Sequence, residues 1–317
     1  MEKRPLVILT GPTAVGKTAL SIKLAKSIGG AIISADSMQV YRHMDIGSAK
    51  VTKKEMDGVP HYLIDVLEPW EEFNVVVFQQ MAKQALEEIY ARGAVPVIAG
   101  GTGFYIQALL YDIDFKENPQ GNQLRAKLEA LAGEKGCEHL HQQLAKVDPE
   151  SAQVIHSHNV KRVIRALEYY QQTGEKISVH NQEERQKESP FAFVYYVITD
   201  ERSRLYARIE KRVDVMLEQG LVDEVKRLKA MGCHRGMVSM QGLGYKEILD
   251  YLDGECSLEE AVYRLKRDTR HFAKRQLTWF KRERDVQWVD LEAFSGDRER
   301  ALAYMEEELR KNLLVLE

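Results

Sequence analysis

The sequence lacks the features that mark disulfide-rich or zinc-binding proteins. Its three cysteines, Cys137, Cys233 and Cys256, are far apart and form no CxxC pair. Their spacing offers no metal cage and favours a reducing, cytoplasmic location. The histidines at 139/141 and 156/158 are two positions apart, which places each pair on different faces of a helix, so we interpret them as surface residues.

Long apolar runs and an excess of positive charge are also missing. No apolar stretch approaches the roughly 18 residues needed to cross a bilayer, so we expect a soluble protein with no membrane partner. We also expect it to be a monomer. The 45 Lys and Arg against 48 Asp and Glu argue against a general nucleic-acid coat. The charge is uneven, however. Residues 264–284 hold nine Lys or Arg and two acids, and Lys161, Arg162 and Arg165 form a second basic cluster.

Apolar runs alternate with helical patterns in the first third of the chain. Strands are expected at 6–10, 31–35, 62–66 and 95–99, with a helix at about 75–92, and this alternation is typical of a doubly wound parallel sheet. The fold class is therefore α/β, with a P-loop core in 1–114 and 191–317. Residues 115–190 have no strand pattern and are predicted to form an all-helical insertion. A further strand is expected at 192–198, followed by a helical C-terminal part that includes a capping box at Ser257–Glu260.

A phosphate-binding motif of the form GxxxxGK[ST] follows the first predicted strand directly. Its residues are Gly11, Pro12, Thr13, Ala14, Val15, Gly16, Lys17 and Thr18. Glycines let the backbone wrap an anion with its N–H groups pointing inward, at the positive end of the helix that follows. We expect Lys17 to reach the outer phosphates and Thr18 to hold Mg²⁺.

A second candidate site lies at the end of the second predicted strand, in Asp36, Ser37, Met38 and Gln39. Ligands of doubly wound sheets bind outside the carboxyl ends of the strands, so Asp36 can lie on the same rim as the P-loop. Its carboxylate could hold Mg²⁺ or accept a proton from a nucleophile. A simple turn or N-cap aspartate is the alternative.

Two further segments could contact a phosphorylated ligand. The turn Gly100-Gly-Thr102-Gly stands where most nucleotide-hydrolysing P-loop proteins have a Walker-B aspartate, which counts against an NTPase motor. It indicates a close approach of backbone to ligand, with the Thr102 hydroxyl available. Arg204, Arg208 and Arg212 are four residues apart on one helix face, which suits a diphosphate clamp, although a solvated charge stripe has the same spacing.

Taken together, GPTAVGKT, SADSMQVYR, AGGTGFY, NVKRVIRALE at 159–168 and the 208–212 helix resemble the tRNA dimethylallyltransferase family, in family order over nearly the whole chain. The resemblance implies transfer of a dimethylallyl group from dimethylallyl diphosphate to N6 of adenosine 37, in the anticodon stem-loop of tRNA.

The resemblance also implies roles for individual residues. The P-loop would hold the diphosphate of the allyl donor. The groups that would neutralise the leaving pyrophosphate are Thr13, Lys17, Thr18, Arg208 and Mg²⁺. Asp36 would accept the N6 proton, while Ser37, Met38, Gln39 and Thr102 would contact the tRNA base, which must be swung out of its stack. The implied tRNA contacts of the insertion are Lys161, Arg162, Val163, Ile164 and Arg165.

Two other functional classes share parts of this pattern. A small-molecule or nucleotide kinase uses the same P-loop and helix-borne arginines, and would consume ATP. An RNA-binding module without ATPase activity is a third class. A prenyltransferase differs from both, because it needs an isoprenoid diphosphate and releases pyrophosphate.

Overall fold

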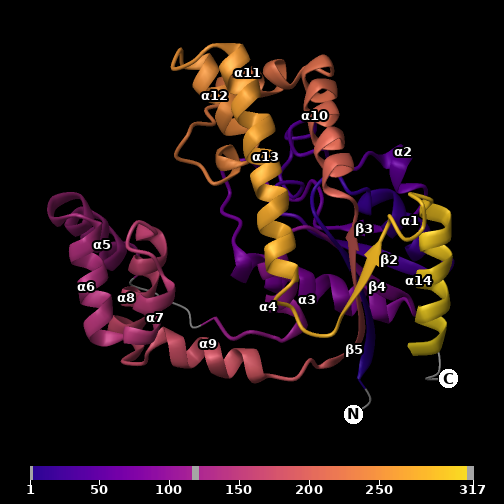
Figure 1. Cartoon of the computed structure of the whole chain (residues 1–317), viewed down its shortest axis with the longest axis horizontal. Coiled ribbons are helices and arrows are strands. Elements are labelled where there is room, and N and C mark those ends of the chain that lie inside the picture. Colours follow the sequence, from indigo (N-terminus) through magenta and orange to yellow (C-terminus); the bar gives the residue numbers. More distant parts are fainter. Residues whose placement is uncertain (1–2, 116–120, 313–317) are drawn as a thin grey trace. The chain divides into compact units, whose positions relative to one another are not determined.

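The computed structural model describes residues 3–115 and 121–312, with the side chains of 121 and 122 left aside. The chain separates into two compact units, Met1–Leu110 with Pro190–Glu317 and Tyr111–Ser189. We call them the core unit and the insertion unit (Figure 1). The insertion predicted at 115–190 starts and ends close to these boundaries.

The core unit is built on a six-stranded sheet in the order β3-β2-β4-β1-β5-β6, and every neighbouring pair is parallel. The strands are β1 (Arg4–Thr10), β2 (Gly30–Ala35), β3 (His61–Tyr62), β4 (Val95–Gly100), β5 (Phe191–Thr199) and β6 (Val286–Asp290). The α/β class with a parallel sheet predicted from the sequence is confirmed. Because β5 pairs with every residue of β1, the sheet resumes after the insertion, as expected.

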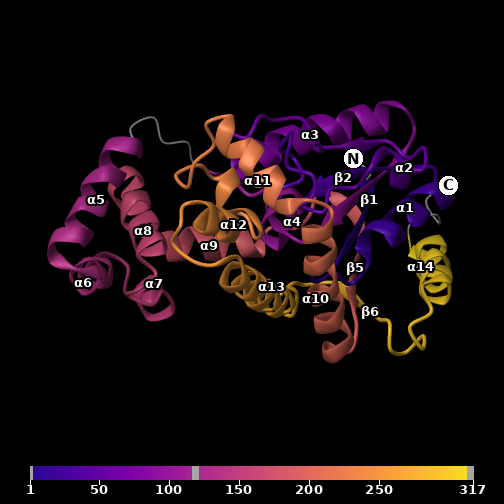
Figure 2. The same cartoon turned by 90° about the horizontal axis from the view of Figure 1, so that it is seen from above.

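Helices cover both faces of this sheet, which explains why its central strands are apolar throughout. Val7 and Leu9 of β1 share one core with α1 (Lys17–Ser27) and α14 (Arg298–Asn312). On the opposite face lie α3 (Val75–Ala91), which Asn74 caps, and α4 (Gly103–Leu110) (Figures 1 and 2). The strand ends that carry the sequence motifs are therefore fixed by packing on two sides.

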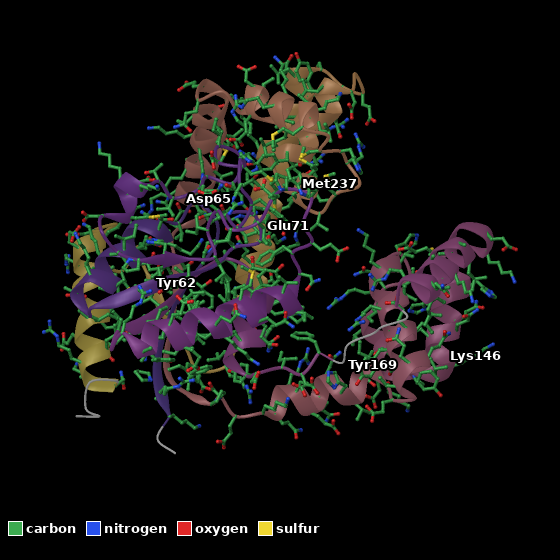
Figure 3. The ribbon with its side chains drawn as sticks, turned by 180° about the vertical axis from the view of Figure 1, so that it is seen from behind. Tyr62, Asp65, Glu71, Lys146, Tyr169 and Met237 are labelled. Carbon is green, nitrogen blue, oxygen red and sulfur yellow. The ribbon has the colours of Figure 1, made fainter. Side chains whose placement is uncertain are left out.

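The strand predicted at 62–66 is wrong beyond Tyr62. Leu63 has φ 62° and Asp65 has φ 55°, a left-handed backbone that cannot continue a strand. The segment becomes a loop in which Asp65 and Asp45 pair with the buried ammonium of Lys50 (Figure 3 labels Tyr62 and Asp65). The predictions also missed β6, a five-residue edge strand.

The C-terminal part of the core unit is mostly helical, as predicted. Its helices are α10 (Arg202–Glu218), α11 (Leu221–Ala230), α12 (Tyr245–Leu252) and α13 (Leu258–Phe280), with short turns α2 (Lys53–Met56) and η1 (Ser239–Gln241) elsewhere. Only half of the predicted capping box forms. Ser257 Oγ accepts from Glu260 N at 3.1 Å, but the Glu260 carboxylate turns to Arg264 at 2.7 Å. None of the helices in the described part of the chain is long and apolar enough to cross a membrane.

Within the described residues, all regular secondary structure of the insertion unit is helical. Its helices are α5 (Gly121–Lys135), α6 (Cys137–Val147), α7 (Pro149–Val154), α8 (Val160–Thr173) and α9 (Ile177–Gln186). Leu140, Leu144 and the apolar stripe of α8 form its core. Arg125 makes a two-pronged ion pair with the fully buried Glu168, at 3.0 and 2.8 Å. Burying Glu168 without such a partner would be costly.

Asp148 joins the ends of two helices in the insertion unit. Its buried carboxylate accepts hydrogen bonds from the backbone and hydroxyl of Ser151, at 3.1 and 2.7 Å, and from those of Ser178, at 3.0 and 2.7 Å. Burial alone would raise its pKa, but the bonds from Ser178 and Ser151 hold the pKa below the usual aspartate range.

We expect Asp148→Ala to destabilise the insertion unit by about 3 kcal/mol, because four donors lose their acceptor. Faster amide hydrogen exchange in α7 and α9 of the intact chain measures this. Glu150→Ala, at an exposed position of the same turn, is the control. Since the folded pKa is depressed, the Asp148 contribution is complete above the unfolded pKa and is lost as the pH falls through the folded one. Unchanged exchange in α9 would show that Asp148 does not hold that helix.

Candidate active site

A cavity of about 400 Å³ opens at the carboxyl ends of β1, β2 and β4, within the core unit. This is the edge at which parallel α/β sheets bind their ligands. Its walls come from the 11–18 loop, from β2 and the segments after it, and from α10. The lining residues are Thr13, Ala14, Gly16, Lys17, Thr18, Ser21, Ile32, Ser34, Asp36, Gln39, Ser48, Val51, His61, Ile64, Ala99, Gly100, Arg208, Lys211 and Arg212.

The 11–18 loop needs glycine at two positions. Gly11 and Gly16 have φ 150° and 102°, and a Cβ on Gly11 would lie 2.4 Å from the carbonyl oxygen of Ile198. Both positions therefore exclude other residues on conformational or steric grounds. Of the eight predicted loop residues, Thr13, Ala14, Gly16, Lys17 and Thr18 line the cavity. The other three, Gly11, Pro12 and Val15, shape the loop behind it.

Side chains from three elements hold the loop in place. Lys17 Nζ donates to the Pro12 carbonyl at 2.8 Å, and Arg208 Nε donates to the Ala14 carbonyl at 3.0 Å. The buried side chain of Gln276, from α13, accepts from Thr13 N at 2.8 Å and donates to the Gly101 carbonyl at 2.9 Å. Gln276 thus ties the loop to the glycine turn after β4. No sequence pattern indicated this link, because 263 residues separate Gln276 from Thr13.

Arg208 is oriented by Asp200, which follows β5. Arg208 Nη2 lies 2.6 Å from Asp200 Oδ2, and Arg204 binds the other oxygen of that carboxylate at 2.9 Å. Burial would raise the pKa of Asp200, but its bonds to Arg208 and Arg204 keep the pKa low and the carboxylate charged. Of the three arginines predicted to form a clamp, Arg208 and Arg212 line the cavity and Arg204 does not.

The cavity carries an excess of positive charge. Lys17, Arg208, Lys211 and Arg212 line it together with one carboxylate, that of Asp36. Burial lowers the pKa of Lys17 to about 7, the nearby Arg212 lowers it too, and Asp36 opposes both. Burial also lowers the pKa of His61, so this imidazole adds no charge at neutral pH. Such a set of cations favours an anionic ligand, which would in turn favour the charged form of Lys17.

Asp36 has the geometry of a turn aspartate and also lines the cavity. Its Oδ1 accepts from Met38 N at 2.8 Å and from Gln39 N at 3.3 Å, which is the geometry of a turn aspartate. The same carboxylate lines the cavity, and Gln39 lies beside it in the wall. Binding the turn fixes the carboxylate in position, so its structural role supports a chemical one.

Three residues predicted to contact the RNA base lie outside the cavity wall. Ser37 and Met38 do not line it, and Met38 packs on Gly242, where a Cβ would come within 2.4 Å of its Cε. Thr102 N donates to the Ala35 carbonyl at 3.1 Å, and its own carbonyl accepts from the first turn of α4. The glycine turn after β4 is therefore hydrogen-bonded to the end of β2.

The sequence patterns did not predict the apolar part of the wall. Ile32, Val51, Ile64 and Ala99 line the cavity from β2, β4 and the two loops around β3. Val51 and Ile64 lie in loop segments that carry no motif. Ile32 and Ala99 belong to strands and resemble ordinary strand residues. Lys211 was also missed, because it is not four residues from the arginines of its helix. The cavity thus pairs a cationic wall with an apolar one.

The predicted contacts in the insertion unit divide by exposure. Lys161 and Arg162 are exposed and Arg165 is half-buried, on the polar side of α8. Val163 and Ile164 are buried in the core of this unit, with 0% and 3% of their surface exposed. The prediction that their side chains contact tRNA is corrected accordingly, because the apolar stripe of α8 faces inward.

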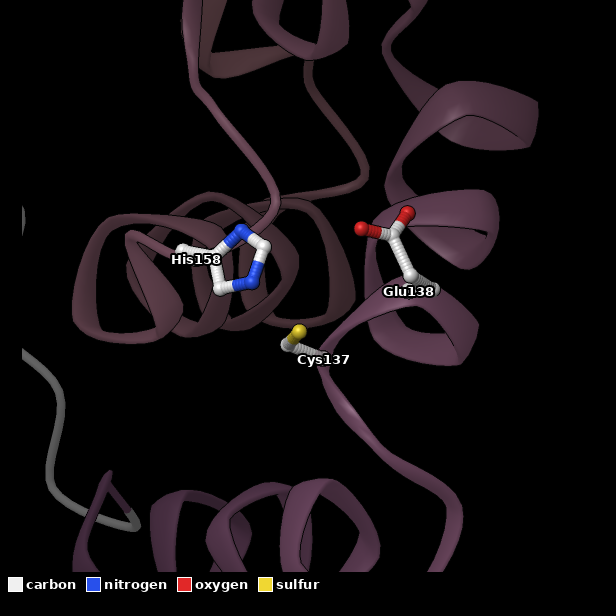
Figure 4. A group of neighbouring side chains, drawn as sticks. All are labelled: Cys137, Glu138 and His158. Atoms are coloured by element: carbon white, nitrogen blue, oxygen red, sulfur yellow. The ribbon is translucent and has the colours of Figure 1, made fainter.

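One group of metal-ligand residue types lies in the insertion unit. The ligand atoms of Cys137, Glu138 and His158 lie within 4.8 Å of one another, although His158 is 20 residues from Glu138 along the chain (Figure 4). Glu138 and His158 are exposed, and Glu138 Oε1 already accepts from Ser157 Oγ at 2.5 Å. We therefore describe this group as a hydrogen-bonded surface cluster, and the candidate active site remains the cavity of the core unit.

The fold defines an α/β protein of the P-loop type, and its cavity has a mainly cationic lining. Family models match the chain as IPP transferase over residues 39–283 and as isopentenyl transferase over residues 5–72. The tRNA dimethylallyltransferase of Lachnoclostridium phytofermentans is 63% identical over 93% of this chain and 94% of its own length. The chain therefore belongs to the IPP transferase family, and it is a transferase.

Solved structures agree with this assignment. A full-length tRNA isopentenylpyrophosphate transferase from Bacillus halodurans is 43% identical, with a TM-score of 0.73 and 99% of each chain covered. A eukaryotic dimethylallyltransferase described as acting on tRNA is 28% identical, with a TM-score of 0.80, and the match covers 98% of this chain and 80% of that one.

Proposed function

We propose that this protein transfers the dimethylallyl group of dimethylallyl diphosphate to N6 of adenosine 37 in tRNA and releases pyrophosphate. The observation that carries the proposal is the composition of the cavity. A cationic loop, an apolar wall and one fixed carboxylate meet in about 400 Å³. A diphosphate linked to a short branched hydrocarbon presents the complementary charge and polarity.

The residues present divide the chemistry between them. Lys17 and Arg208 would neutralise the diphosphate as the allylic C–O bond breaks and the leaving group gains charge. Asp36 would accept the proton of N6 as the new C–N bond forms, so one proton and one allyl group change place for each pyrophosphate released. Ile32, Val51 and Ile64 would cover the hydrocarbon.

Mg²⁺ fits this arrangement. Thr18, an exposed residue, and Asp36 line the same cavity. Mg²⁺ takes oxygen ligands and is commonly held by one or two protein groups plus phosphate oxygens. When bound, it would supply charge neutralisation at the leaving diphosphate.

Not all of the basic residues in 264–284 are available to contact tRNA. Four of the nine cations in 264–284 are already paired with acids. The pairs are Arg264 with Glu260, Lys266 with Asp214, Arg267 with Asp268 and Arg270 with Glu210. Lys274, Lys281 and Arg282 are exposed and have no ion pair within the described residues. We therefore assign phosphate contact to this C-terminal end of α13, together with Lys161, Arg162 and Arg165 of the insertion unit.

Lys274→Ala should flatten the dependence of log tRNA affinity on log salt by up to about 0.7–0.9. Removing one phosphate contact releases one fewer counterion, which gives the expected size. The measurement is a tRNA binding titration at several salt concentrations. Lys226→Ala on α11 changes the charge equally but removes a cation paired with Asp223 at 3.2 Å, so its slope should match that of the unchanged protein. Equal slopes in all three proteins would place the RNA elsewhere.

A nucleotide kinase was the alternative expected from the loop, which by itself also suits ATP, but the family match favours the prenyltransferase. One assay separates the two. The protein is incubated with Mg²⁺, unmodified tRNA and either dimethylallyl diphosphate or ATP, and the tRNA is digested to nucleosides for mass analysis. We expect N6-prenylated adenosine and pyrophosphate with the first donor. ATP consumption without a prenylated nucleoside would overturn the proposal.

A further inference from the structure

Arg298, the first residue of α14, lies against the 11–18 loop. A Cβ placed on Gly16 would come within 2.7 Å of Nη2 and 2.8 Å of Cζ of Arg298. The guanidinium is therefore in direct contact with the Gly16 backbone. Arg298 does not line the cavity, but Gly16 does, so one residue of backbone separates this charge from the site.

Packing fixes this position. Ala301, Leu302 and Met305 of α14 are buried in the core that α1 shares. The Asp297 carboxylate caps α14 by accepting from Glu299 N at 2.9 Å and Arg300 N at 3.2 Å. Because α1 begins at the end of the loop, the packing of α1 against α14 keeps Arg298 beside the loop.

The Arg298 guanidinium has no charged partner among the residues that the structure describes. Within residues 3–115 and 121–312, the half-buried guanidinium makes no hydrogen bond and no ion pair. By contrast, Arg204 and Arg208 bind Asp200, and Lys23 of α1 pairs with Glu299 of α14. A fixed, unpaired arginine behind an anion-binding loop raises the potential where the anion sits.

We propose that Arg298 belongs to the diphosphate site, where its charge acts through space to strengthen binding of the allyl donor. This inference rests on the proposed function, since it assumes that the loop holds a diphosphate. It extends the site beyond the segments that the family models match, 5–72 and 39–283. It also gives α14 a role besides packing.

Four variants of the full chain test the inference, with Mg²⁺ and inorganic pyrophosphate as the probe. Arg298→Met keeps the length of the side chain and removes its charge. Arg298→Lys keeps the charge. Arg300→Met is the matched control, because residues two apart on a helix do not share a face and Arg300 is exposed. Lys17→Ala reports on the loop itself.

At low salt, Arg298→Met should raise the Kd for pyrophosphate about five- to twentyfold, as expected for one charge a few ångströms behind the site. The difference should shrink with added salt, because solvent ions screen a half-exposed charge. Arg298→Lys should restore most of the affinity, and Arg300→Met should bind as the unchanged protein does. tRNA affinity should stay the same in all four.

The possible failures are distinguishable. Weak binding in Lys17→Ala with normal binding in Arg298→Met overturns the role of Arg298 and leaves the proposed function standing. Equal losses in Arg298→Met and Arg298→Lys, independent of salt, show a packing role and also overturn the inference. Normal binding in both Lys17→Ala and Arg298→Met would contradict the diphosphate site itself.

Discussion

Asp36→Asn should slow prenyl transfer within a single turnover by about two to four orders of magnitude, while donor and tRNA still bind. The amide keeps the acceptor oxygen that Met38 N and Gln39 N bind, so the turn after β2 can stay intact. It cannot take the proton that N6 loses when the new C–N bond forms. The single-turnover rate, with the affinity for each substrate measured separately, gives this result.

The competing role for Asp36 is metal coordination, and a Mg²⁺ titration separates the two. If Asp36 mainly holds Mg²⁺, the variant should bind the donor more weakly and regain much of its rate at high Mg²⁺. If it accepts the proton, added Mg²⁺ should restore little. Asp223→Asn, at an exposed carboxylate of α11, is the control. A normal rate in Asp36→Asn would exclude both roles.

Lys17→Ala should lower turnover by roughly a hundredfold or more, with little change in tRNA affinity. Its ammonium lines the cavity and also binds the Pro12 carbonyl at 2.8 Å, so the variant loses a charge at the leaving group and a bond that shapes the loop. Lys23→Ala on α1 is the control, because Lys23 pairs with Glu299 outside the cavity. Loss of tRNA affinity with normal turnover of bound tRNA would refute the diphosphate assignment.

Lys17 should also make donor binding depend on pH. Its pKa of about 7 in this structure means that it is charged below this pH and increasingly neutral above it. A diphosphate binds the charged form better, so its binding raises the pKa and takes up a proton. Donor affinity should therefore fall as the pH rises above about 7, and proton uptake on binding should appear in calorimetry in buffers of different ionisation enthalpy. Lys17→Ala should lose this uptake.

The sequence predicted the parallel core well because its signals are local. Buried strands leave apolar runs, and the turns between them need glycine or a capping side chain. The sequence-based prediction of secondary structure failed where contacts between distant residues determine the backbone conformation. Residues 63–66 have a strand-like composition, yet the left-handed Leu63 and Asp65 turn the chain so that Asp65 meets Lys50. β6 was missed for the converse reason, since a short edge strand needs β5 beside it.

The residues of the site likewise fall into those that the sequence indicated and those that only the structure showed. The 11–18 loop, Asp36 and Gln39 could be found because they follow the ends of predicted strands. Arg208 and Arg212 could be found from their four-residue spacing on one helix. Gln276 and Lys211 could not, since glutamine and lysine on a polar helix give no signal of their own. The apolar wall was hidden because its residues resemble core residues until the loops around β3 bring them to one cavity.

The sequence by itself determined the α/β class, the phosphate loop and the family, because these depend on motifs that act over a few residues. Only the tertiary structure decided which charges are available. Asp200 orients Arg208, while Glu210, Asp214 and Glu260 neutralise cations that the sequence had presented as one basic stripe. Arg298 lies beside Gly16 although 282 residues separate them along the chain. An ion pair depends on distance in space, and no local pattern encodes that distance.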